Sequence, residues 1–189
     1  RLSRRTYRLL EKKAAELSLP IEVIRELHPA IVAAVFSAWK LSNMGFSVPG
    51  IDLHYLEKAK EESKPLLYLE NVETHMAALF AAGSENEDEY VFSSLKDLDA
   101  AGTELITLID EWKRGTGTTT ERTVIEMAGQ YPETYRIMIA DRNRAWLPLI
   151  ESYLASSEIE FVIAGTGHFY GPDGLLAMLA GLGYHIEQL

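Results

Sequence analysis

The stretch EFVIAGTGHFYGPDGLLAMLAGLGYHIEQL, residues 160–189, decides the fold that the sequence predicts. Its apolar and β-branched beginning is typical of a buried strand, which ends at Gly165. A glycine-rich loop then presents His168, and Pro172 and Gly183 delimit a short helix. The final YHIEQL alternates like another strand. A turn requires the glycines but has no use for the imidazole, so we interpret the loop as a candidate site.

Helical patterns account for most of the remaining sequence. The short apolar run PLLYLE lies between two of them and is typical of a buried strand. We therefore expect an α/β fold, a helix-rich mixed α/β domain with a small central sheet, and strands near 65–70, 159–165 and 184–189. No linker, repeat or low-complexity segment divides the chain, which predicts a single domain over residues 1–189.

Composition excludes several classes of site. The 189 residues carry a net charge of −10 without a basic stripe, which argues against nucleic acid as a partner. The chain has no cysteine, which excludes thiol catalysis and zinc–thiolate centres. The longest apolar stretch, PAIVAAVFSAW, is shorter than the ~20 residues of a membrane span, so no transmembrane segment is expected here.

The cellular compartment stays open at this point. The sequence begins with Arg1, which is not an initiator residue. If a preceding segment carried a signal peptide, the protein would be exported, for example to the periplasm.

The ends of two expected strands carry polar side chains. Glu70 ends one strand, and His168 follows the other. If these strands are parallel neighbours, both side chains face one crevice, where a carboxylate and an imidazole suit a divalent metal or an acid–base pair. His75 follows Glu70 by five residues and is near enough to reach the same crevice. Two structural alternatives stay open: Glu70 as an acid at a helix N-terminus, and His168 hydrogen-bonded to backbone.

DRNRAWLPLI, residues 141–150, is the other stretch dense in polar groups. Arg142 and Asn143 offer fixed donors to a carboxylate or a peptide group of a substrate. The alternative is an ion-paired helix with Trp146 packed into the core. The sequence contains no nucleophile elbow and no dinucleotide fingerprint. GTGTTTE is not a phosphate loop, because it lacks the lysine of that motif.

Three stretches, residues 50–79, 141–154 and 161–189, resemble the TraB/PrgY/GumN family, relatives of the Tiki metalloproteases, in order and spacing over nearly all of the chain. The resemblance implies a mixed α/β fold of the kind shared with erythromycin-esterase-like and ChaN-like proteins. The family carries a GxxH motif twice, and the second falls on Gly165 and His168. The family's first GxxH motif has no counterpart here, so we expect a domain that is N-terminally truncated relative to the family.

The resemblance also implies roles for individual residues. The family's acid falls on Glu70 and its Arg-Asn pair on Arg142 and Asn143. The Tiki relatives are thought to hold a divalent ion with such His and Glu residues for peptide-bond hydrolysis. The leading hypothesis is thus a metal-dependent, peptidase-like hydrolase, with His168 and Glu70 as catalytic residues and as ligands of Mn²⁺, Co²⁺ or Zn²⁺. The groups expected at the peptide or small-molecule substrate are Arg142, Asn143, Gly165, Thr166 and Gly167.

Two other hypotheses stay open. The first is a non-catalytic module that binds a peptide in the same crevice, as the pheromone-shutdown role associated with the PrgY branch would allow. A catalytic ion usually takes about three protein ligands, and His168 and Glu70 are only two, which weakens the case for activity. The second is an incomplete fold that forms a homodimer to cover exposed core.

Overall fold

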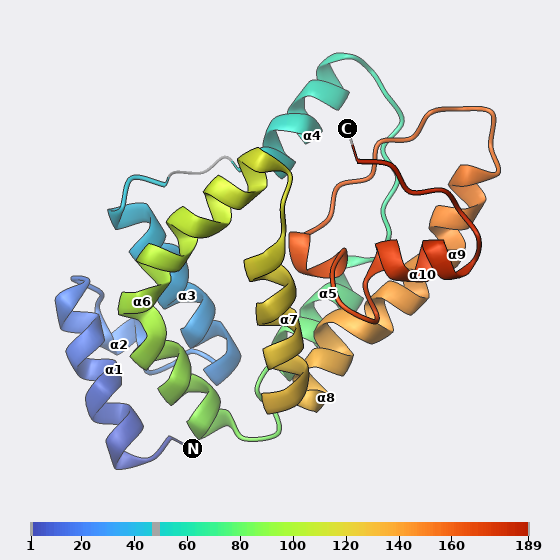
Figure 1. Ribbon diagram of the computed structural model, residues 1–189. Coiled ribbons are helices and arrows are strands. Elements are labelled where there is room, and N and C mark those ends of the chain that lie inside the picture. The colour runs from blue at the N-terminus through green and yellow to red at the C-terminus, as the bar shows by residue number, and fades with distance from the viewer. Residues whose placement is uncertain (1, 47–49, 189) are drawn as a thin grey trace.

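The computed structural model describes residues 2–46 and 50–188, apart from the side chains of residues 97 and 99–101. Within that part the chain is helical (Figure 1). In chain order the elements are α1 (Arg4–Glu16), α2 (Ile21–Ile24), α3 (Pro29–Asn43), α4 (Ile51–Glu61), α5 (Val72–Ala81), α6 (Glu87–Arg114), α7 (Thr118–Gln130), α8 (Pro132–Tyr135), the π-helix η1 (Arg136–Ala140), α9 (Asp141–Leu154), the 3-10 turn η2 (Thr166–His168) and α10 (Leu175–Gly181).

The helix boundaries follow from capping residues in the sequence. Ser3 accepts a hydrogen bond from the Thr6 amide at the start of α1. Asn71 caps α5 in the same way, through the Thr74 amide. Helix α6 ends at Gly115, whose φ of 70° is the left-handed conformation that glycine adopts without strain. Such local signals fix where each helix begins and ends.

The expected central sheet is absent from residues 2–46 and 50–188, so the prediction of a mixed α/β domain is wrong. The segments 65–70, 159–165 and 184–188 are irregular chain and share no backbone hydrogen bonds with one another. Residue 189 lies outside the described residues. The side chain of Ile159 is 99% exposed, where a sheet would bury it. Strand-like composition favours extended backbone, but a strand also requires a partner, which composition does not provide.

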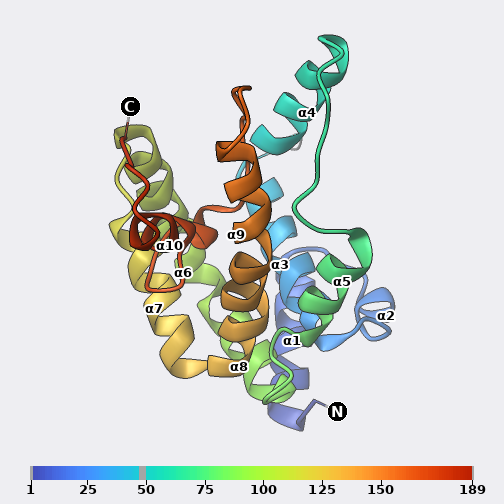
Figure 2. The ribbon, with the colours of Figure 1, turned by 90° about the vertical axis from the view of Figure 1, so that its right-hand side faces the viewer.

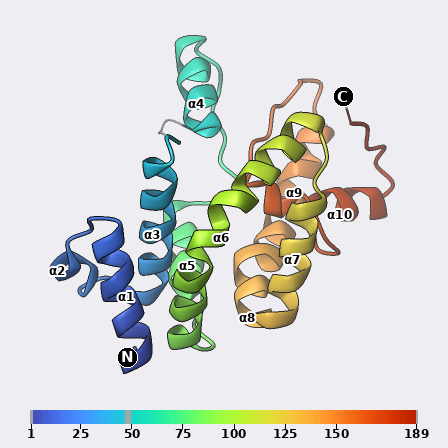
Figure 3. The same cartoon turned by 60° about the vertical axis from the view of Figure 1, so that its left-hand side comes forward.

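Helix α6 joins two groups of helices. It packs against α1 and α3 on one side and against α7 on the other, and Figure 3 shows it crossing the middle of the molecule. The larger buried cluster lies in the first group and includes Leu10, Ile24, Phe36, Val91 and Leu95. In the second group, α9 lies between α10 and α5 (Figure 2). The side chains of the candidate site come from the segments around α5 and α9 and from the loop that precedes α10.

The helices also answer the question of a membrane span. Among residues 2–46 and 50–188, none of them combines the length and the apolar character that crossing a bilayer requires.

Candidate functional site

Glu70 and Arg142 form the charged centre of the site. Glu70 directly precedes Asn71, the cap of α5, and Arg142 lies in the first turn of α9. The guanidinium binds the carboxylate with two hydrogen bonds, Nε to Oε2 at 3.0 Å and Nη2 to Oε1 at 2.7 Å. His75, in the first turns of α5, places Nδ1 2.8 Å from Oε1 of Glu70. The Glu70 and Arg142 side chains are only 14% and 11% exposed, so this ion pair is largely shielded from water.

Arg142 is held in place by two further contacts. Its Nη1 donates to the carbonyl of Met138, one turn earlier in η1, at 2.9 Å. Its guanidinium lies over the ring of Trp146, 4.8 Å from the ring centroid. The π-helical turn η1 directly precedes α9, and such turns occur frequently at functional sites. Arg142 is therefore pre-oriented rather than a mobile surface cation.

His168 is fixed by Asn143. The imidazole is 6% exposed and Asn143 is fully buried. The Asn143 amide nitrogen donates to two carbonyls, those of His168 at 3.0 Å and Asp173 at 2.7 Å. Both of its N–H groups are thereby used, and the amide oxygen faces Nδ1 of His168 at 2.7 Å. Since that oxygen can only accept, Nδ1 carries the proton and Nε2 carries the lone pair.

The environment keeps His168 neutral. Burial, reinforced by the charge of Arg142, lowers the pKa of His168 to about 4. For Glu70, burial alone would raise the pKa, but the hydrogen bonds from Arg142 and His75 and their charges outweigh it, so the pKa is lowered. The site therefore holds, near neutral pH, an ionised carboxylate, a guanidinium and an uncharged imidazole.

The loop that carries His168 is braced at Asp173. One oxygen of this carboxylate accepts from the Tyr135 hydroxyl at 2.9 Å, and the other accepts from Arg144 at 2.6 Å. Burial, followed by the bond to Asp173, raises the pKa of Tyr135 to about 12, so the phenol remains a donor. These contacts tie the loop to α8 and α9. Sequence reasoning missed this brace, and its only local signal is an acid that follows Pro172.

The glycines of the loop have unequal importance. A Cβ on Gly165 would meet the nearest atom, Cδ2 of His168, at 3.8 Å, which is an ordinary contact. Gly167 has similar room. A Cβ on Gly174 would instead lie 2.5 Å from the carbonyl oxygen of Phe169. The loop therefore requires the missing side chain at Gly174, and at Gly171 through its φ of 83°, whereas Gly165 and Thr166 are exposed and Gly167 is half-buried.

The structure brings several of the expected site residues together through helices and loops rather than at the edge of a sheet. Arg142 contacts Glu70 and covers Trp146, and His168 packs against the same indole with ring centroids 4.4 Å apart. Trp146 is only 4% exposed, and its ring contacts both Arg142 and His168. The alternative of an ion-paired helix with a buried Trp146 is confirmed as well. Glu70 binds side chains rather than the free amides of α5.

The donor set does not fit a catalytic divalent ion as it stands. Both carboxylate oxygens of Glu70 accept hydrogen bonds from Arg142, whose positive charge would repel the ion. Within the described parts of the chain, no three His, Asp or Glu side chains are grouped so as to hold a metal. A catalytic ion usually takes about three protein ligands. The ion remains an expectation from the resemblance.

Comparison with models of protein families identifies the family to which this chain is similar. The model of the TraB/PrgY/gumN family matches residues 1–188. No curated protein and no solved structure match the chain.

Proposed function

This chain belongs to the TraB/PrgY/gumN family, and from that premise we propose that it is a peptidase-like hydrolase with its reacting centre between Glu70 and His168. One observation carries the proposal: Asn143 fixes His168 as the Nδ1–H tautomer, which leaves Nε2 with a lone pair. An oriented, uncharged imidazole beside a guanidinium is a combination that hydrolytic sites use.

His168 orients and activates the water in this proposal. The water donates a hydrogen bond to Nε2 and attacks the carbonyl carbon of the substrate. As the new C–O bond forms, the water proton passes to Nε2, and the imidazolium then protonates the leaving amine as the C–N bond breaks. A base with a pKa of about 4 is weak. Most of the rate enhancement is therefore assigned to orientation and charge rather than to proton removal.

Arg142 and Glu70 supply the charges. The guanidinium stabilises the oxyanion that develops on the carbonyl oxygen, because its position is already fixed by Met138 and Trp146. Glu70 favours the transient imidazolium, since its charge acts to raise the pKa of His168. Gly165, Thr166 and Gly167 line the approach of the peptide. Asn143 acts through His168, because its amide groups are already engaged inside the protein.

The divalent ion, Mn²⁺, Co²⁺ or Zn²⁺, is a separate proposal and no step above uses it. Calorimetric titration of each ion into chelator-treated protein tests it. Stoichiometric binding that disappears in His168→Gln would support ligation by this residue. Absence of binding in both proteins would remove the ion and leave the metal-independent route.

The second candidate is a non-catalytic peptide-binding module. The observation that favours it is the full engagement of Glu70, whose two oxygens are held by Arg142 and His75. Such a module would use the same surface to hold a peptide without cleaving it. The two functions differ in one property, because only the hydrolase inserts water into the bound peptide.

Cleavage in ¹⁸O-labelled water distinguishes the two functions. The protein is incubated with a mixture of unrelated decapeptides, and mass spectrometry follows new carboxyl termini that contain ¹⁸O. We expect labelled products from the wild type and at least a ~100-fold lower rate from His168→Gln. His185→Gln is the matched control, because His185 is exposed and lies outside the site. Peptide retention without labelled products would favour the binding module.

A further inference from the structure

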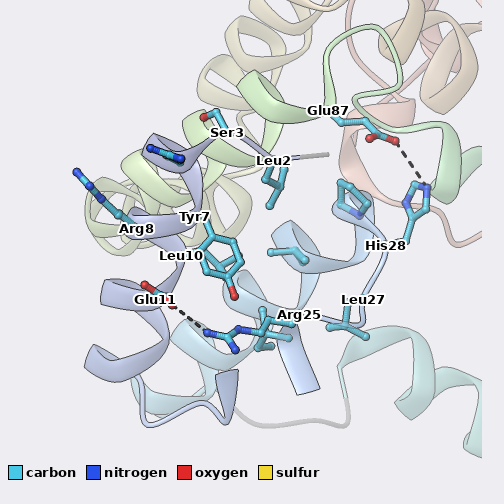
Figure 4. Close-up of a pocket in the computed structure, with 14 residues that line it drawn as sticks. Leu2, Ser3, Tyr7, Arg8, Leu10, Glu11, Arg25, Leu27, His28 and Glu87 are labelled. Carbon is cyan, nitrogen blue, oxygen red and sulfur yellow. Dashed lines mark hydrogen bonds and ion pairs between the residues drawn. The ribbon is translucent and has the colours of Figure 1, made fainter. Parts of the chain in front are cut away.

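A separate cavity is lined by residues of the first three helices. These helices lie on the opposite side of the molecule from α9 and α10 (Figure 1). The cavity has a volume of about 910 Å³ and opens between α1, α2 and the start of α3. We call it the α1–α3 hollow and define it by Tyr7, Leu10, Ile24, Leu27 and Val32, which are among the lining residues in Figure 4. Small-molecule sites typically have volumes of about 300–1,000 Å³, so the hollow is large enough for a ligand.

The floor of the hollow is apolar and firmly packed. Leu10, Ile24 and Val32 are 1%, 3% and 2% exposed and belong to the larger buried cluster of the protein. Tyr7 and Leu27 are partly buried and pack against the same cluster. An aliphatic group that entered the hollow would exchange water for these side chains, which favours binding in proportion to the apolar area removed from water.

The rim also carries two acids. Glu11 accepts a hydrogen bond from Arg25 at 3.0 Å, and Glu87 lies 3.9 Å from Nε2 of His28, a contact that is an ion pair only when His28 is protonated. Figure 4 shows these two contacts on opposite sides of the hollow. Arg25 therefore balances the charge of Glu11, and Glu87 is the acid that can remain unbalanced.

Two arginines of the rim have no such partner. Arg4 and Arg8 line the hollow and are four residues apart on α1, so they extend from the same side of the helix. Within the described part of the chain, neither makes a hydrogen bond or an ion pair. Both side chains are exposed and long enough to turn toward a ligand. The net charge at the mouth of the hollow is thus positive.

From these features we propose that the α1–α3 hollow binds an amphipathic monoanion, an aliphatic chain that ends in a carboxylate. The chain would lie on Leu10, Ile24 and Val32, and the carboxylate would bind Arg4 and Arg8. A peptide is a poorer match, because the floor consists of the aliphatic side chains of Leu10, Ile24 and Val32, which offer no hydrogen bonds to a peptide backbone. This site is independent of the hydrolase proposed above.

Calorimetry with straight-chain carboxylates tests the proposal on the full chain. Octanoate, decanoate and dodecanoate are titrated below their micelle concentrations. We expect one site per chain and an affinity that rises about fourfold for each added methylene that is buried. Decanol, which has the tail but no charge, should bind at least ~10-fold more weakly than decanoate.

Two variants locate the binding site. The double variant Arg4→Gln/Arg8→Gln should weaken decanoate at least ~10-fold, because both charge-assisted contacts are lost. Arg5→Gln/Lys12→Gln is the matched control, since it removes the same charge from α1 at residues that do not line the hollow. Leu27→Trp keeps the rim charges and should block the tail. Absence of saturable binding, or equal affinity in the two double variants, would overturn the proposal.

Discussion

The amide oxygen of Asn143 accepts a hydrogen bond from Nδ1–H of His168 at 2.7 Å, while its amide nitrogen donates to the carbonyls of His168 and Asp173. This arrangement links the tautomer of the imidazole to the shape of the loop that carries it. A change at Asn143 therefore affects both the stability of the protein and the chemistry at Nε2.

Asn143→Leu should destabilise the protein by about 3 kcal/mol. The substitution preserves size but leaves buried groups of His168 and Asp173 without partners, each at a cost of about 1–3 kcal/mol that relaxation partly offsets. Urea denaturation measures the free energy of unfolding. Asn43→Leu is the control, because Asn43 is exposed at the end of α3 and should change stability by less than about 0.5 kcal/mol. Equal effects of both substitutions would refute the role of Asn143.

The low pKa of His168 predicts a loss of stability in mild acid. The ring titrates near 4 in the folded protein and near ~6.5 in the unfolded chain. Between these values the unfolded chain binds the extra proton, so the free energy of unfolding decreases as pH falls from ~6.5 to ~4, by up to about 3 kcal/mol. Below pH ~4 this contribution no longer changes.

Urea denaturation at a series of pH values, with chelator present, checks this dependence. His168→Gln cannot titrate and should flatten the profile between pH ~6.5 and ~4. The lowered pKa of Glu70 contributes in the same direction only at lower pH, below the ordinary value of 4.5. A profile that is unchanged in His168→Gln would show that the ring does not carry the predicted shift.

The Glu70–Arg142 pair should show strong energetic coupling. A double-mutant cycle with Glu70→Gln and Arg142→Gln is expected to give about 1–3 kcal/mol, because the two-bond contact is shielded from water. The exposed Arg122–Glu104 pair, at 3.4 Å with side chains 60% and 45% exposed, should give less than about 1 kcal/mol in the same cycle. A coupling in the buried pair no larger than in the exposed one would contradict the assigned geometry.

Gly174→Ala should be more harmful than Gly165→Ala. The new Cβ at residue 174 would approach two backbone carbonyls, so the loop must shift, at a cost of about 2–3 kcal/mol. The Cβ at residue 165 makes only an ordinary contact, and stability should change by less than about 1 kcal/mol. Thermal unfolding of the two variants provides the comparison. The reverse order of the two midpoints would mean that Gly165, not Gly174, is the constrained position.

Local signals in the sequence predicted most of the chain as helical, and they predicted two features of the candidate site. The proximity of His75 to Glu70 and the burial of Trp146 are each confirmed. The resemblance carried by Gly165 and His168 is confirmed by the match to the family. These features depend on neighbours along the chain or on a short motif, and the sequence contains that information directly.

Features that depend on distant partners were predicted incorrectly or missed. The runs at 65–70 and 159–165 have strand-like composition but no ladder in the described parts of the chain, because pairing depends on what lies beside them. The brace of Asp173 by Tyr135 joins residues 38 positions apart. No spacing rule relates them. The engagement of both Asn143 amide groups also depends on the path of the 166–174 loop.

The proposed chemistry depends on His168 being a neutral imidazole with its proton on Nδ1 and its lone pair on Nε2. Two-bond ¹H–¹⁵N correlation NMR of histidine-labelled protein reports the protonation of each ring nitrogen, and His168→Gln identifies the signal. We predict an Nδ1–H tautomer at neutral pH whose Nε2 stays unprotonated down to about pH 4. A proton on Nε2, or a titration near ~6.5, would contradict it.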